Sequence, residues 1–135
     1  MKQLDTILLI DDDFATNYLH KKIISKSGID TPIEVANDGE EGINKLLSLN
    51  KSINNENATI LVFLDLNMPV MDGWGFLKQF AIIRSTVLCN VDLYVLSSSI
   101  NPDDKARATS NSLVIDYYPK PLSIATLKNI RSNYL

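Results

Sequence analysis

The sequence predicts an α/β fold in which helices cover both faces of a five-stranded parallel sheet. Five short apolar runs have the length of strands, and each is followed by a segment with helical periodicity. Strands and helices that alternate in this way form a doubly wound parallel sheet through right-handed crossovers. The third run, residues 60–64, contains five consecutive apolar residues. An unbroken run of this kind is typical of a central strand that is buried on both faces.

Length and composition are those of one globular domain, and we expect residues 1–135 to form a single unit. The net charge is −3 and no long basic run occurs, so nothing indicates a nucleic-acid partner. No apolar run is long enough for a signal peptide or a membrane span. The single cysteine, Cys89, excludes an intrachain disulfide framework. We therefore expect a soluble, cytoplasmic protein that does not bind a membrane.

Apolar runs and helix signals place the individual elements. We expect strands over residues 6–10, 33–36, 60–64, 92–96 and 113–117. We expect helices over residues 14–27 and 39–49, from 73 to 84 or beyond, in a short segment from Pro102, and after Ser123. Asp13 and Ser123 are the expected N-caps of the first and last helices. The asparagine-rich residues 50–59 are expected to be a surface loop, and residues 85–91 fit either a helix end or a loop.

Helical spacing also predicts which side chains face the core. The inward residues are expected to include Leu19, Ile23 and Ile24 in the first helix and Ile124, Leu127 and Ile130 in the last. His20 is expected on the polar side of its helix, and Trp74 in or near the core. The fourth helix is polar, with only Ala106 and Ala108 as inward candidates. We therefore expect that helix to be loosely packed and mobile.

Polar residues follow four of the five strands. Asp11 and Asp12 follow the first strand, Asp65 the third, Ser97 the fourth and Lys120 the fifth. All strands of a parallel sheet end at the same edge. In the flavodoxin-like order 2-1-3-4-5, the first and third strands are neighbours, as are the third and fourth. We therefore expect these five side chains to gather on one rim of a flavodoxin-like (βα)5 fold.

Clustered carboxylates repel one another, so such a rim is stable with a divalent cation bound. A few oxygen ligands at an open site suit Mg²⁺, which keeps several waters and completes its shell with phosphate. Phosphoryl transfer needs positioning and charge neutralisation, which a metal, Lys120 and the hydroxyl of Ser97 can supply. Asp65 would then attack in line and become an aspartyl phosphate.

Four segments together resemble the receiver domain of two-component response regulators, in its stand-alone, chemotaxis-regulator-like form. The resemblance covers essentially the whole chain. The segments are Leu-Leu-Ile-Asp-Asp-Asp at 8–13, Phe-Leu-Asp-Leu-Asn-Met-Pro-Val-Met-Asp-Gly at 63–73, Val-Leu-Ser-Ser at 95–98, and Asp-Tyr-Tyr-Pro-Lys-Pro-Leu at 116–122. Each segment lies at the end of an expected strand, and the four in this order are highly specific.

The resemblance implies a role for each matching residue of the acidic rim. Asp65 is the phospho-acceptor. Mg²⁺ is bound directly by Asp12 and Asp65, by the backbone carbonyl of Asn67, and by Asp11 largely through water. Asp72, which is also acidic, is expected to contribute to the turn and not to the metal.

On the opposite side of the rim, the resemblance makes Lys120 the cation that binds the phosphoryl group. It also implies a cis peptide between Lys120 and Pro121. Ser97 is expected to donate a hydrogen bond to the phosphoryl group, and Tyr117 to be a switch residue that turns inward when Ser97 moves.

The function that follows is signalling, not catalysis on a separate substrate. A sensor histidine kinase or a histidine phosphotransfer protein would supply the phosphoryl group. The chain would catalyse only its own phosphorylation and dephosphorylation. A downstream protein is expected to bind the face formed by the fourth helix, fifth strand and fifth helix, with no nucleic acid involved.

Two other functions fit the same fold less well. A Mg²⁺-dependent phosphohydrolase with an aspartate nucleophile needs a second aspartate two residues after the first, where this chain has Asn67. A nucleotide- or flavin-binding module needs a glycine- or hydroxyl-rich loop after the first strand. That position holds three aspartates at 11–13, which repel phosphate unless a metal is present.

Overall fold

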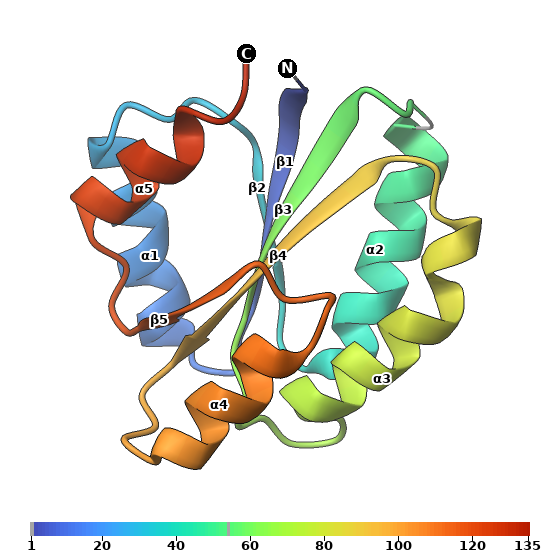
Figure 1. Cartoon of the computed structure of the whole chain (residues 1–135). Helices are drawn as coiled ribbons and strands as arrows, with labels where there is room; N and C mark the ends of the chain where they lie inside the picture. Colours follow the sequence, from blue (N-terminus) through green and yellow to red (C-terminus); the bar gives the residue numbers. More distant parts are fainter. Residues whose placement is uncertain (1, 54) are drawn as a thin grey trace.

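A computed structural model describes residues 2–53 and 55–135 and has alternating strands and helices, as predicted (Figure 1). The strands are β1 Gln3–Ile10, β2 Ile33–Ala36, β3 Ala58–Leu64, β4 Asn90–Ser97 and β5 Asp116–Pro119. The helices are α1 Phe14–Lys26, α2 Gly39–Ile53, α3 Gly73–Ile83, α4 Pro102–Ser110 and α5 Ile124–Arg131. A 3-10 turn, η1 Arg84–Thr86, follows α3. None of the described helices is long and apolar enough to cross a membrane.

The five strands form one parallel sheet in the order β2-β1-β3-β4-β5, which confirms the predicted topology. Helices α1 and α5 cover one face, and α2, α3 and α4 lie on the other side (Figure 1). Ile10 pairs with Leu64, and Leu64 pairs with Val95. The residues that follow β1 and β3 therefore emerge side by side.

The core lies on both faces of the sheet, with β3 buried along its whole length. Alternate residues of β3 belong to different clusters: Val62 and Leu64 pack with Phe76 of α3, whereas Leu61 and Phe63 pack with Leu127 of α5. Full burial of each such side chain stabilises the fold by about 1.5–3 kcal/mol. The strand that carries Asp65 at its end is therefore held firmly from both sides.

Several element boundaries differ from the prediction, and for two of them the structure shows the cause. Helix α2 continues to Ile53, into the expected loop, because Leu49 and Ile53 lie one turn apart and both pack against the core. Position 54 of that expected loop lies outside the described residues. Strand β5 begins at Asp116 and not at 113, because Asn111 holds the preceding residues in a turn. Its side chain and its carbonyl accept the N–H groups of residues 113 and 114 at 2.9 and 3.0 Å.

The inward face of α1 was predicted wrongly at two positions. Leu19 is 45% exposed, whereas His20 is only 2% exposed. The buried residues of this helix are Asn17, His20 and Ile24, which follow one another at helical spacing. The buried stripe therefore contains two polar side chains, which apolar periodicity alone does not identify.

The later helices differ from the prediction in a similar way. Ile124 is exposed because it is the first residue of α5, whereas Leu127 and Ile130 are buried as predicted. Ala106 of α4 is exposed, and Ala108 is the single buried residue of that helix. Helix α4 is thus held to the rest of the molecule by little apolar contact.

Candidate functional site

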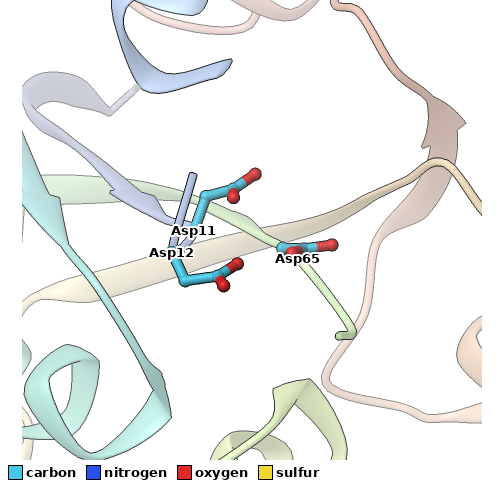
Figure 2. A group of neighbouring side chains, drawn as sticks. All are labelled: Asp11, Asp12 and Asp65. Carbon is cyan, nitrogen blue, oxygen red and sulfur yellow. The ribbon is translucent and has the colours of Figure 1, made fainter. Parts of the chain in front are cut away.

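Three carboxylates meet where β1 and β3 end. Asp11 and Asp12 follow β1 directly, Asp65 follows β3, and one oxygen of each lies within 4.8 Å of the others. Figure 2 shows the three side chains extending into the same space. The strand register explains their meeting, because the Asp65 N–H donates to the Ile10 carbonyl at 2.9 Å. Asp11 and Asp65 are buried, and Asp12 is exposed at the edge.

Lys120 joins this cluster from the end of β5. Its Nζ lies 2.6 Å from Asp11 Oδ2 and 3.2 Å from Asp65 Oδ1. Its backbone N–H donates to the Ser97 carbonyl at 3.0 Å, which anchors the residue to the end of β4. The peptide that follows, Lys120–Pro121, is cis. The sheet thus brings residues 11, 12, 65 and 120 together as the sequence predicts.

The cluster has more negative than positive charge and could therefore bind another cation. Burial raises the pKa of Asp65, the charge of Lys120 opposes this, and repulsion from Asp11 adds to it. Burial also disfavours the charged form of Lys120. The hydrogen bond to Asp11 and the charges of both carboxylates outweigh that effect and raise its pKa. One lysine therefore faces three carboxylates. A bound divalent ion would reduce the repulsion that remains among these carboxylates.

The loop between β1 and α1 fixes the first carboxylate. The Asp13 N–H donates to Asp11 Oδ1 and the Asn17 amide donates to the Asp11 carbonyl, both at 2.9 Å. Asp13 itself caps α1, as predicted, by accepting the Thr16 N–H at 3.2 Å and the Thr16 hydroxyl. These bonds from Thr16 lower the pKa of Asp13. The side chain of Asp13 is therefore engaged by the helix and is not a member of the carboxylate cluster formed by Asp11, Asp12 and Asp65.

The segment after β3 approaches Asp65 closely at Gly73. A Cβ at Gly73 would lie 2.4 Å from the Asp65 carbonyl oxygen, so only glycine fits there. The Gly73 N–H donates to the Leu66 carbonyl at 3.0 Å. Asp72 caps α3 by accepting the Gly75 N–H at 2.9 Å, which agrees with its predicted structural role. This packing fixes the backbone on which Asp65 sits.

An open cavity of about 460 Å³ lies above the carboxylates. Besides the acidic residues and Lys120, the residues that line it are Thr16, Leu19, His20, Asn67, Ser98 and Pro121. Asn67 is exposed at its rim. The cavity is large enough for a phosphoryl group together with a hydrated ion.

Ser97 does not line this cavity, although the sequence places it at the rim. It is buried, and its hydroxyl accepts the Ser99 N–H at 3.0 Å. The neighbouring residue, Ser98, faces the cavity instead. The sequence has three consecutive serines at this strand end, and which of them lines the cavity depends on how the strand terminates.

Tyr117 is already buried in this structure, in the cluster that includes Phe76 and Val95. Its hydroxyl donates to the Ser99 carbonyl at 3.4 Å. It therefore contacts the same loop residue as Ser97 does.

His20 is a residue of this site that sequence reasoning missed. Its Nε2 accepts the Leu122 N–H at 3.3 Å and so ties α1 to the loop that follows Lys120. Burial lowers the pKa of His20, and Lys120 lowers it further against the opposing charge of Asp11. A neutral imidazole is required for this bond, because Nε2 must be free of a proton to accept it.

Comparisons with known proteins agree with this geometry. The family model of the response regulator receiver domain matches residues 7–131. A crystal structure of a two-component response regulator from Cytophaga hutchinsonii is 29% identical with a TM-score of 0.80, and the match covers 98% of this chain and 97% of that one. The probable C4-dicarboxylate response regulator DctR of Halalkalibacterium halodurans is 28% identical over 128 residues, which are 95% of this chain and 50% of that protein.

A third solved structure of the same fold is a complex. The receiver domain of a Saccharomyces cerevisiae response regulator, co-crystallised with its histidine phosphotransfer signaling protein, has the same fold. It is 19% identical with a TM-score of 0.73, and the match covers 99% of this chain and 90% of that one. The present chain spans half or less of the length of the curated relatives it matches, several of which are named protein-glutamate methylesterases. Four clustered residues at the strand ends and a family match across nearly the whole length thus agree, and the chain belongs to the response regulator receiver domain family of two-component signalling systems.

Proposed function

We propose that this receiver domain, spanning residues 1–135, takes a phosphoryl group onto Asp65 in a Mg²⁺-dependent reaction and signals through phosphorylation-dependent binding of a protein. The observation that carries this proposal is the position of Asp65 in an open cavity. Its carboxylate lies 3.2 Å from Lys120 Nζ and close to the carboxylates of Asp11 and Asp12.

The acidic residues of the rim fit a magnesium ion. Asp12 and Asp65 would bind it directly, Asp11 largely through water, and Asn67 through its backbone carbonyl. The donor set consists of oxygen atoms alone and is open on one side, as Mg²⁺ sites that also bind phosphate usually are. When bound, the ion supplies positive charge to the phosphoryl oxygens.

The chain's own groups carry out the transfer. An oxygen of Asp65 attacks phosphorus in line, so that a new O–P bond forms while the bond to the donor's leaving group breaks. Lys120 stays protonated, as its raised pKa favours, and stabilises the charge on the phosphoryl oxygens. Because Ser97 does not line the cavity, its side chain must turn toward the phosphoryl group before its hydroxyl can donate to one of these oxygens.

The proposed donor is a sensor histidine kinase or a histidine phosphotransfer protein. Family membership supports this choice, and a related receiver domain has been crystallised with a phosphotransfer protein. A phosphohydrolase acting on other substrates is disfavoured, because Asn67 stands where that class needs an acid. We therefore propose that the chain catalyses only its own phosphorylation and dephosphorylation.

Mass spectrometry of the intact protein tests the acceptor. After incubation with acetyl phosphate and Mg²⁺, the protein should gain one phosphoryl group that hydroxylamine removes. Asp65→Asn should gain none, because an amide is not a nucleophile for this transfer. Asp72→Asn is the matched control, since it removes an acid from the same loop but keeps a good helix cap, and it should be labelled normally. Label on Asp65→Asn would assign the acceptor to another residue.

Thermal and denaturant unfolding with and without Mg²⁺ test the metal site. Because only the folded chain presents the three carboxylates together, Mg²⁺ at tenfold above its Kd should raise the free energy of unfolding by about 1.4 kcal/mol. Asp12→Ala should lose this gain and most of the phosphorylation rate. Asp13→Asn, which removes a neighbouring charge but keeps the cap of α1, should retain both. An Asp12→Ala protein that is phosphorylated at the wild-type rate would contradict the ligand assignment.

A further inference from the structure

A second cavity, of about 480 Å³, lies between α3 and α4. In Figure 1, α4 lies at the bottom of the molecule, and α3 begins at the lower right and rises along the right side. No residue lines both this cavity and the one above Asp65. The groove is thus a separate feature of the fold, and the proposed chemistry makes no use of it.

The charged side chains that line this groove are all positive. Lys78 and Arg84 come from the α3 side and Arg107 from α4, and no acidic side chain lines the cavity. None of the three forms an ion pair with the residues that the structure describes. The chain as a whole carries a net charge of −3, so this groove is a local positive region on an acidic protein. Clustered cations without partners attract anions.

Trp74 positions one of these cations. The guanidinium carbon of Arg107 lies 3.9 Å from the centroid of the Trp74 ring, which is a close cation–π contact. A guanidinium held against an aromatic ring still has N–H groups that can bind two phosphate oxygens at once. The side chain is therefore partly ordered before any ligand arrives.

The rest of the lining suits the organic part of a ligand. Leu77, Ala81 and Leu113 give an apolar wall, and the side-chain amide nitrogen of Asn111 and the hydroxyl of Ser112 are available as hydrogen-bonding groups. The volume lies within the range of about 300–1,000 Å³ that is usual for small-molecule sites. We propose that the groove between α3 and α4 binds a small organic phosphate of about the size of a mononucleotide.

Titration of isotope-labelled, unphosphorylated protein with AMP, in EDTA and followed by NMR, tests this proposal. EDTA prevents a metal from bringing phosphate to the acidic rim, so the result does not depend on the function proposed for Asp65. AMP should give saturable shifts at the Trp74 indole and in residues of α3 and α4. Adenosine, which lacks the phosphate, should give none.

Charge variants identify the binding groups. Arg84→Gln and Arg107→Gln should each weaken AMP binding at least tenfold. The cation–π contact of Trp74 is made by Arg107, so Arg84→Gln leaves that contact intact. Lys105→Gln, an exposed cation of α4 that does not line the groove, should bind AMP as the wild type does. Equal binding by the arginine variants, equal binding of adenosine, or shifts confined to the rim around Asp65 would each overturn the proposal.

Discussion

Among the residues that the structure describes, Val70 is the non-glycine residue with a positive φ, at 66°. It is the centre of a three-residue turn in which the Met71 N–H donates to the Pro69 carbonyl at 2.8 Å. A β-branched side chain is strained in this conformation by about 1–2 kcal/mol. Val70 is 80% exposed, so packing of its side chain offsets little of this strain. The strain lies in the loop that follows the proposed acceptor.

Val70→Gly should therefore raise the free energy of unfolding by about 0.5–1 kcal/mol. The gain is smaller than the strain because glycine also loses more backbone entropy on folding. Chemical denaturation with an unchanged m-value measures the effect. Ile100→Gly is the control, since Ile100 is also an exposed loop residue but lacks the positive φ, and it should give no gain. A loss of stability in Val70→Gly would show that the turn is not strained.

The environment of His20 leads to a second prediction, which concerns how the stability of the fold depends on pH. Its pKa is lowered in the folded state, so the unfolded chain binds a proton first as the pH falls below about 6.5. Its contribution to stability is thus fully present above that pH and is lost as the pH falls through the folded pKa. Stability falls by up to about 1.4 kcal/mol per pH unit within this window.

The comparison with His20→Gln isolates this effect. Gln can still accept the Leu122 N–H but does not titrate, so the variant should lose less stability than the wild type between pH 7.5 and 5.5. Asp65, whose raised pKa has the opposite effect, is present in both proteins and cancels in the difference. His20→Leu, which has no acceptor, should be less stable than His20→Gln at pH 7.5. Identical pH profiles for the wild type and His20→Gln would contradict the assignment.

At the level of single residues, the sequence predicts correctly the positions of side chains that directly follow a strand. Asp11, Asp65 and Lys120 each follow a strand of a parallel sheet, so their meeting follows from topology alone. His20 and Ser98 were missed for a different reason. Whether a polar residue next to a strand or on a helix faces the site depends on a rotation of that element, which tertiary packing sets and local pattern does not.

Among the elements, the existence of the strands was easier to predict than the positions at which strands and helices begin and end. Buried parallel strands are uninterrupted runs of apolar residues, so β1 and β3 were predicted from these runs. The end of α2 depends on Ile53, a single side chain beyond a polar stretch, and the start of β5 depends on the turn at Asn111. Such boundaries depend on one or two tertiary contacts, and the spacing of apolar residues in the sequence gives no information about those contacts.

Helix α4 was predicted to be loosely packed, and the structure gives this a physical basis. Ala108 is its single buried residue, and its first turn is held by polar contacts. Asn101 caps it by accepting the Asp103 N–H at 3.0 Å, and the Ser99 hydroxyl donates to Asp104 at 2.7 Å. An element held by a few exposed or partly buried hydrogen bonds and one small apolar residue belongs to the least stable part of a fold.

On the scale of the whole molecule, Ser99 links the proposed phosphorylation site to α4. Its N–H donates to Ser97 Oγ, its carbonyl accepts the Tyr117 hydroxyl, and its own hydroxyl donates to Asp104 of α4. On the proposed mechanism, Ser97 must turn toward the phosphoryl group, which breaks the first of these bonds. We therefore expect the loop at Ser99 to shift and α4 to move with it, changing the face formed by α4, β5 and α5.

Amide hydrogen exchange with and without beryllofluoride, a phosphoryl mimic, tests this coupling. Protection should change in residues 97–110 and around Tyr117, with a coupling free energy of about 1–3 kcal/mol between the site and this face. Ser99→Ala removes the hydroxyl that binds Asp104 but keeps both backbone bonds. It should therefore lower the protection of α4 before beryllofluoride is added and reduce the change that follows. Changes confined to residues 11–27 would instead place the output surface on α1, because the signal would then leave the site through the helix that begins beside Asp12.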